Sequence, residues 1–168
     1  SLDFKVRQGD SLVQRIGKKM FPVSGHADIP SSAKAKVTKL KELKAEFFQN
    51  KHKDGWEIKQ TEYRVFKDIL HAEIERKRKN LRDLGENPNE QIDLFGGDEK
   101  ERQQKLEFFK ERIEALKFEI DELQEEMHAL HEDRPLIWNI EFAEIFFDKG
   151  GFDIIIGNPP YVRQEAIA

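Results

Sequence analysis

A heptad repeat of apolar residues in the second half of the chain constrains the fold more than any other feature. Apolar residues recur there at alternating steps of three and four, at Leu106, Phe109, Ile113, Leu116, Ile120, Leu123, Met127 and Leu130. This spacing is typical of a helix that packs along one seam against another helix. With Asp98 as N-cap and Pro135 as terminator, the helix would have about 36 residues and a length of about 50 Å. A helix of this length with one apolar face needs a partner.

Two earlier segments can provide that partner. Residues 61–84, with Thr61 as cap and Gly85 as terminator, carry apolar residues at helical spacing: Phe66, Ile69, Leu70, Ile74, Leu81 and Leu84. Residues 32–50 do the same with Val37, Leu40, Leu43 and Phe47. We therefore expect residues 31–133 to form a helical hairpin or a three-helix arm.

Charge separates the predicted helices into two blocks, although the net charge of the chain is only −4. Residues 31–84 carry 15 basic and 9 acidic side chains, whereas residues 85–133 carry 6 basic and 16 acidic ones. Antiparallel packing would place opposite charges along the edges of the seam. The basic block could also contact phosphates. The sequence favours the simpler interpretation, in which these charges solvate a helix face and pair with the acidic helix.

The segments on either side of the predicted arm have strand patterns. Residues 4–7 alternate apolar and polar side chains, as a half-buried strand does. Residues 152–156 form an apolar run with three consecutive Ile, which is typical of a strand buried on both faces of a parallel sheet. We expect a mainly α fold, in which a helical hairpin or coiled-coil insertion separates two strand pieces of an incomplete α/β, Rossmann-like fold.

Four residues that follow the second predicted strand carry the clearest chemical signal, namely Asn158, Pro159, Pro160 and Tyr161. Successive prolines remove two backbone donors and leave carbonyl acceptors at the carboxyl end of a strand, where α/β sheets bind ligands. These carbonyls and the Asn158 amide oxygen can hold an exocyclic NH₂ group, and Tyr161 can stack on a base. The alternative is a Pro-Pro turn that only ends a strand.

The sequence from Phe152 to Glu165, FDIIIGNPPYVRQE, resembles the catalytic strand and loop of DNA adenine-N6 methyltransferases. The resemblance is strongest to type II restriction-modification enzymes that fuse methylation and cleavage in one chain, and it extends upstream to residues 138–146. It implies that Asn158 and the Pro159 carbonyl hold the target amine and that Tyr161 stacks on the flipped adenine. It further implies double-stranded DNA as partner and S-adenosylmethionine as cofactor, with no metal.

The same resemblance gives a role to Asp10, which follows the first predicted strand. In the family an acidic residue at this point accepts a hydrogen bond from the cofactor's adenine amine; otherwise Asp10 is an ordinary turn residue. The Gly-rich cofactor motif of the family is absent from the sequence. We therefore expect an internal fragment that is inactive alone, with a methyltransferase strand and cofactor turn (1–12), a linker (13–30), the helical arm (31–133), and the catalytic strand and loop (134–168).

Three weaker motifs lie in or near the arm. Gln91-Ile92-Asp93-Leu94-Phe95 resembles the peptide by which bacterial replication proteins bind the sliding clamp. His128 and His131 have a spacing that could bind a metal, but they are more simply solvated. Asp54 with Glu57 and Lys59 resembles a nuclease triplet, which a chain rich in Glu and Lys produces by chance. We assign neither a metal site nor a nuclease.

Composition excludes several classes of protein. The chain has no Cys, so a disulfide framework and a Cys-ligated metal are excluded, and a cytoplasmic setting is expected. No apolar run reaches the roughly 20 residues of a membrane span. The main alternative to a methyltransferase piece is a helical interaction module without catalysis, which would contact DNA, the clamp or another subunit.

Overall fold

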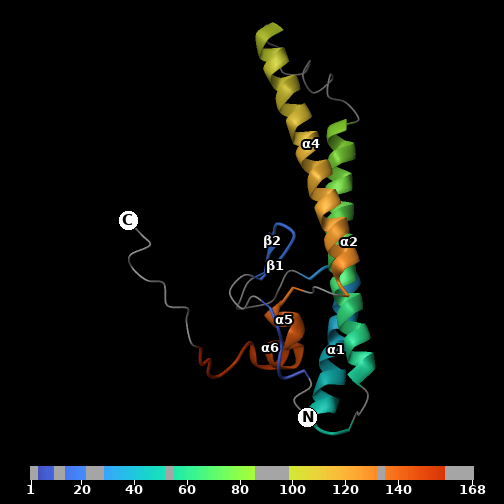
Figure 1. Ribbon diagram of the computed structural model, residues 1–168, viewed down its shortest axis with the longest axis vertical. Coiled ribbons are helices and arrows are strands. Elements are labelled where there is room, and N and C mark those ends of the chain that lie inside the picture. The colour runs from blue at the N-terminus through green and yellow to red at the C-terminus, as the bar shows by residue number, and fades with distance from the viewer. Residues whose placement is uncertain are drawn as a thin grey trace, which may run out of the picture.

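The computed structural model describes residues 4–9, 14–21, 29–51, 55–85, 99–131 and 135–157. Its regular elements are three long helices, two short helices and one hairpin (Figure 1). The long helices are α1 (Ser31–Phe48), α2 (Gly55–Gly85) and α4 (Glu99–Ala129). The short elements are α5 (Trp138–Glu141), α6 (Ala143–Lys149), β1 (Arg15–Ile16) and β2 (Lys19–Met20).

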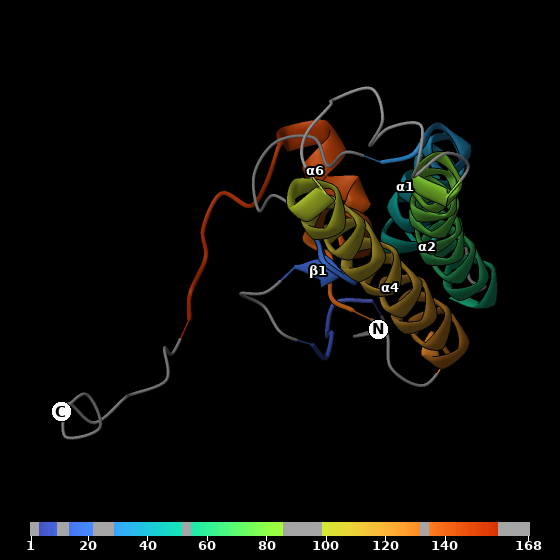
Figure 2. The same cartoon turned by 90° about the horizontal axis from the view of Figure 1, so that it is seen from above.

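The helices form an elongated bundle with a broad base and a narrow upper part. α2 and α4 run side by side in the middle and upper parts of the bundle, with α4 extending beyond the upper end of α2, while the lower part of α2 packs against α1 (Figures 1 and 2). α6 packs against α1, and α5 contacts α2. The predicted mainly α architecture with a long helical hairpin is therefore confirmed. Within the described ranges, no helix is both long enough and apolar enough to cross a bilayer.

α1 begins and ends where the local sequence favours it. The Pro30 carbonyl accepts hydrogen bonds from the amides of Ala33 and Lys34, and Asn50 leaves the helix with a φ of 57°. Asn is among the residues that adopt this left-handed conformation most readily. The predicted apolar face is confirmed, because its members Val37, Leu40 and Leu43 are buried.

α2 begins earlier than the sequence suggested. The helix starts at Gly55, so the prediction of Thr61 as its cap is wrong. Thr61 lies buried inside the helix, and its hydroxyl donates a 2.8 Å hydrogen bond to the carbonyl of Glu57 one turn back. This bond satisfies a hydroxyl that would otherwise be buried without a partner.

α4 confirms the heptad seam. Every predicted seam residue from Leu106 to Leu130 is buried or half-buried, and most of the other α4 side chains are exposed. The helix has 31 residues, somewhat fewer than expected. Lys77 Nζ of α2 lies 2.5 Å from Glu119 Oε2 of α4, which is an instance of the predicted attraction between the basic and acidic helices.

Neither predicted flanking strand is a strand in the structure. Residues 4–9 consist of turns, bends and irregular backbone, and residues 152–157 have no regular secondary structure. A strand is stable only beside another strand, and nothing in the described ranges pairs with either segment. Instead, Phe4 packs edge-to-face on Phe47, with ring centroids 5.2 Å apart.

The only described sheet is a two-stranded antiparallel hairpin in the stretch that was expected to be a linker. Its turn residue Gly17 has a φ of 55°, a conformation that glycine adopts without strain. The Gly17 amide donates to both carboxylate oxygens of Glu126, at 2.9 and 3.2 Å, and Ile16 is buried. Residues 14–21 are therefore packed against α4 (Figure 2).

Candidate functional site

The residues with predicted chemical roles fall outside the described ranges. Asp10 is one of them, and the others are Asn158, Pro159, Pro160 and Tyr161. Gly9 and Gly157, which immediately precede Asp10 and Asn158, are described. The structure therefore shows how the bundle holds the two segments that lead into the predicted site.

The first of these segments, residues 4–9, is held closely against the bundle. A Cβ atom added at Gly9 would lie 2.6 Å from Leu136 Cβ, so only glycine fits at this contact. Leu136 directly precedes Ile137 and α5, both parts of the chain that leads to the predicted catalytic loop. The segment that precedes Asp10 therefore contacts, through Gly9 and Leu136, the part of the chain that leads to Asn158.

A buried cluster of four charged side chains, which we call the base charge cluster, joins the same segments to the helices. It consists of Arg7, Lys44, Glu62 and Glu141. Glu62 Oε1 lies 2.5 Å from Arg7 Nη2 and 2.8 Å from Lys44 Nζ, and Arg7 Nε lies 2.8 Å from Glu141 Oε2. The side chains of Lys44 and Glu62 are fully buried.

The cluster contains two positive and two negative side chains, so each buried charge has a partner of opposite sign. Lys44 also donates to the backbone carbonyls of Ile140 and Glu141, so it joins α1 to α5 directly. Removing one member of such a cluster leaves an unpaired buried charge, which is strongly destabilising. The base charge cluster therefore fixes the position of Arg7, three residues before Asp10, relative to α1, α2 and α5.

The second segment is held by an aromatic cluster. Phe152 packs against Trp138, Phe142 and Phe146, with ring centroids 5.7, 5.3 and 5.6 Å apart. Beyond Phe152 the chain leaves the bundle (Figure 1), and Ile154, Ile155 and Ile156 are 79%, 79% and 94% exposed. These isoleucines were expected to be buried. The difference has a physical reason, since the described residues provide no sheet to cover them.

Two polar groups beside α5 and α6 complete the surroundings. Gln14 Oε1 accepts a 2.8 Å hydrogen bond from the Trp138 amide, so the segment that enters the hairpin also fixes the start of α5. Burial raises the pKa of the Glu144 carboxyl above its usual value, and the nearby charge of Lys44 partly opposes this effect.

An open cavity of about 610 Å³ lies beside Gly9. Its lining includes Arg7, Gln8, Tyr63, His131 and Glu141. The rings of Tyr63 and His131 are stacked, with centroids 4.2 Å apart and planes 18° apart. The cavity therefore combines flat aromatic groups with hydrogen-bonding groups next to the residue that precedes Asp10.

The weaker motifs of the arm have different outcomes. No group of side chains suited to a metal ion occurs among the described residues, and His131 stacks on Tyr63. Glu57, one member of the nuclease-like triplet, pairs with Lys39 at 2.6 Å, while Asp54 lies outside the described ranges. Residues 91–95, the clamp-like peptide, also lie outside them.

Sequence reasoning missed the base charge cluster, although the sequence contains a signal for it. Lys44 occupies the position one heptad after Val37 on the apolar face of α1, and Glu62 lies between Ile58 and Val65 on that of α2. A charged residue in an apolar slot predicts a buried ion pair when a second element supplies the opposite charge. Arg7 and Glu141 carry no such periodic signal.

Comparison with known proteins gives one family. The family described as Eco57I restriction-modification methylase matches residues 33–168, which include the long helices, α5, α6 and the sequence Asn158 to Tyr161. No curated protein and no solved structure matches the chain.

Proposed function

Because the chain belongs to the Eco57I restriction-modification methylase family, we propose that it carries the catalytic loop of an S-adenosylmethionine-dependent DNA adenine-N6 methyltransferase. The observation that carries this proposal is the sequence Asn158-Pro159-Pro160-Tyr161 after an apolar run, inside the range that the family matches. The substrate is double-stranded DNA, from which the target adenine is flipped.

The proposed roles follow from the chemistry of an aromatic amine. The adenine N6 nitrogen is a poor nucleophile because its lone pair is delocalised into the ring. Hydrogen bonds from its two N–H groups to the Asn158 side-chain oxygen and the Pro159 carbonyl favour a tetrahedral nitrogen with a localised lone pair. Pro160 fixes the backbone of this loop, and Tyr161 stacks on the flipped base.

S-adenosylmethionine supplies the methyl group and its sulfonium is the leaving group, so the reaction needs no metal. In this proposal Asp10 accepts a hydrogen bond from the adenine amine of the cofactor. The polar cavity beside Gly9 supports this role, because it offers open space and hydrogen-bonding groups next to the residue that precedes Asp10. The close contact of Gly9 with Leu136 would then keep the cofactor turn near the chain that leads to Asn158.

The test is transfer of labelled methyl from S-adenosylmethionine to DNA by the full-length gene product. The Asn158→Ala variant should lose at least 100-fold in rate, because removing one positioned hydrogen-bonding group at a reacting centre costs about 10²–10³. Asn80→Ala, at an exposed position of α2, is the matched control and should keep full activity. Equal activity of both variants would remove Asn158 from the mechanism.

The alternative function, a helical interaction module without catalysis, makes the opposite prediction for the same assay. No DNA would then be methylated by the wild-type product, whatever its sequence. Binding of a partner by the arm would be unaffected by Asn158→Ala. The clamp-like peptide at residues 91–95 stays a hypothesis, and a pull-down with Gln91→Ala and Phe95→Ala together tests it.

A further inference from the structure

The outer face of α2 carries a row of basic side chains, which we call the α2 stripe. The stripe consists of Arg64, Lys67, His71, Glu75, Arg78 and Arg82. Steps of three and four keep all six on one side of the helix. From Arg64 to Arg82 the row extends about 27 Å at 1.5 Å per residue. It holds four permanent positive charges and one carboxylate.

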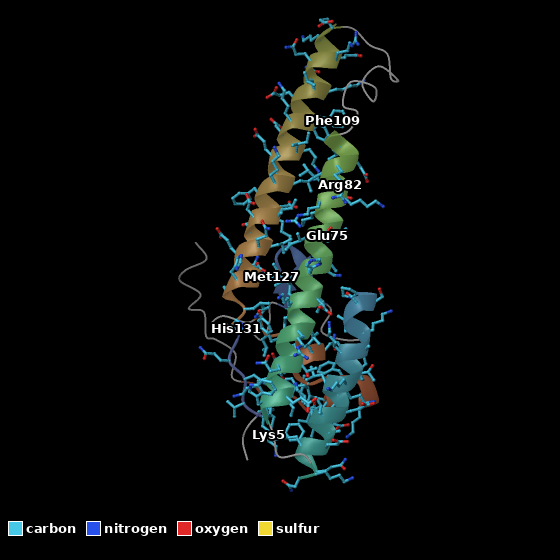
Figure 3. The ribbon with its side chains drawn as sticks, turned by 90° about the vertical axis from the view of Figure 1, so that its right-hand side faces the viewer. Lys5, Glu75, Arg82, Phe109, Met127 and His131 are labelled. Atoms are coloured by element: carbon cyan, nitrogen blue, oxygen red, sulfur yellow. The ribbon has the colours of Figure 1, made fainter. Side chains whose placement is uncertain are left out.

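The stripe lies opposite the packed face of α2. The residues that α2 buries, such as Val65, Ile69 and Ile74, face α1, α4 and the rest of the core. The stripe residues are exposed, and Arg78 is partly exposed, with 42% of its side-chain surface accessible to solvent. Glu75 and Arg82 lie on the part of α2 that extends above α1 (Figure 3), so none of the described helices covers the upper stripe on that side.

Several basic side chains of α1 and of the inner face of α2 pair with carboxylates inside the bundle. Lys36 pairs with Asp68, and Lys39 pairs with Glu57. Lys77 pairs with Glu119, which it reaches across the seam. For these side chains the simpler interpretation of the basic block, pairing within the bundle, is correct.

The stripe differs from this pattern. Within the part of the chain that the structure describes, the ion pairs of this region of α2 involve Arg76, Lys77 and Arg78, and none involves Arg64, Lys67 or Arg82. Arg78 pairs with Glu75 at 3.0 Å, but both side chains are more than 40% exposed, so the pair is weak and can exchange. The exposed residues of α4 have an excess of carboxylates over Lys and Arg instead, and the carboxylates include Glu111, Glu114, Asp121, Glu122 and Glu125.

We propose that the α2 stripe binds the phosphate backbone of double-stranded DNA. A row of exposed Arg and Lys side chains complements a polyanion, whereas the carboxylates exposed on α4 disfavour an approach of DNA from that side. Arg is well suited to this contact because its planar guanidinium matches the geometry of phosphate oxygens. The identity of the polyanion rests on the proposed function, which makes DNA the substrate.

The test is the salt dependence of DNA binding by the full-length gene product, measured by fluorescence anisotropy with a labelled duplex in a series of NaCl concentrations. The stripe variant combines Arg64→Gln, Lys67→Gln, Arg78→Gln and Arg82→Gln. Each lost phosphate contact lowers the slope of log affinity against log salt by about 0.9, so the slope should fall by about 3 to 4. Circular dichroism establishes that the variant is folded.

A matched control removes four positive charges from α4 instead. It combines Lys100→Gln, Arg102→Gln, Lys110→Gln and Lys117→Gln, which changes the net charge by the same amount. Its slope should stay within about 1 of the wild-type value. An unchanged slope in the stripe variant, or an equal fall in the control, would overturn the proposal.

Two further experiments distinguish binding of DNA by the stripe from binding of acidic proteins and from the proposed catalytic function. Polyglutamate that displaces the duplex at an equal concentration of charges would make the stripe a surface for acidic proteins and would overturn DNA as its ligand. Asn158→Ala should methylate poorly while keeping the wild-type salt slope. If the wild-type product transfers no methyl group but the salt slope of its DNA binding still falls in the stripe variant, the proposed function is contradicted. The proposal that the stripe binds DNA would then still hold.

Discussion

The base and the tip of the bundle use the same kinds of residues in opposite ways. We define the base as α1, α5, α6, the hairpin and the parts of α2 and α4 beside them, and the arm tip as residues 78–85 and 99–115. At the base, Lys44 and Glu62 pair with no exposure to solvent. Arg78 at the arm tip pairs with Glu75, one turn before it on α2, and both side chains are more than 40% exposed. Phe108 at the arm tip is 64% exposed.

The difference follows from the number of layers. Two helices can shield only the seam between them, so the arm tip half-buries seam residues such as Leu106, Phe109 and Ile113, fully buries none of its residues and leaves most of them exposed. At the base, further elements cover the outer faces, and Leu116, Ile120 and Leu123 of the same heptad repeat are buried. A regular seam therefore specifies a helix along its whole length, but the covering elements decide where the helix contributes most to stability.

The largest predicted effect comes from breaking the base charge cluster. Glu62→Gln removes the carboxylate that Arg7 and Lys44 share, so it should lower the free energy of unfolding by about 3–5 kcal/mol. Glu75→Gln removes an exposed partner of Arg78 and should cost less than about 1 kcal/mol. Urea denaturation of the two variants measures both values. Equal losses would show that the two pairs are equivalent.

Truncation of one seam residue in each region sharpens the comparison. Leu123→Ala at the base should cost about 2–4 kcal/mol, because Leu123 is 1% exposed and the cavity it leaves is enclosed. Leu106→Ala at the arm tip should cost less than about 2 kcal/mol, since its side chain is only half-buried and its neighbours can close the gap. The comparison fails if Leu106→Ala is the more destabilising change in thermal unfolding.

A pair of glycine substitutions tests the packing of the hairpin against the base. At Gly17, with a φ of 55°, an added Cβ would lie 2.6 Å from Leu123 Cδ2, so Gly17→Ala should cost about 1–3 kcal/mol through backbone strain and crowding. Gly150 has a similar φ of 79° but nothing within 4 Å, so Gly150→Ala should cost only the strain, about 1 kcal/mol. Similar melting temperatures for both variants would argue against the packed hairpin.

The smallest predicted effect is a pH dependence at the boundary between the two regions. Hydrogen bonds from Lys77 and Lys18 lower the pKa of Glu119 from 4.5 to about 2. A lowered pKa stabilises the fold above the unfolded value, and this stability disappears as the pH falls from about 4.5 to about 2. Since Lys18 is largely exposed, we expect only about 1 kcal/mol. The difference between wild type and Glu119→Gln in melting temperature should therefore vanish near pH 2, and a constant difference would refute the assignment.

The arm of the bundle could be predicted from the sequence, whereas much of the base could not. The helices of the arm follow from periodicity alone, because the seam from Leu106 to Leu130 and the face of Val37, Leu40 and Leu43 repeat regularly. The start of α2 did not follow, since the Thr61 hydroxyl can bond inside a helix as well as cap one, whereas the predicted end at Gly85 is confirmed. The base depends on contacts between residues far apart in sequence, such as Arg7 with Glu62, which no local pattern encodes.

The strand predictions teach a related lesson. An apolar run such as residues 152–156 specifies a strand only together with the neighbours that pair with it, and no described residue pairs with it here. The predicted site is encoded differently. Asn158, Pro159 and Tyr161 are recognisable because the proposed methyl transfer needs these residue types in this order, and that signal can be read from the sequence without the surrounding fold.

The most direct test of the central claim is the identity of the methylated nucleoside. DNA treated with the full-length gene product and labelled S-adenosylmethionine is digested to nucleosides and separated by chromatography. The account predicts that the label is in N6-methyladenine for the wild-type product and is lost in Asn158→Ala. Label in N4-methylcytosine or 5-methylcytosine, or undiminished N6-methyladenine in Asn158→Ala, would contradict it.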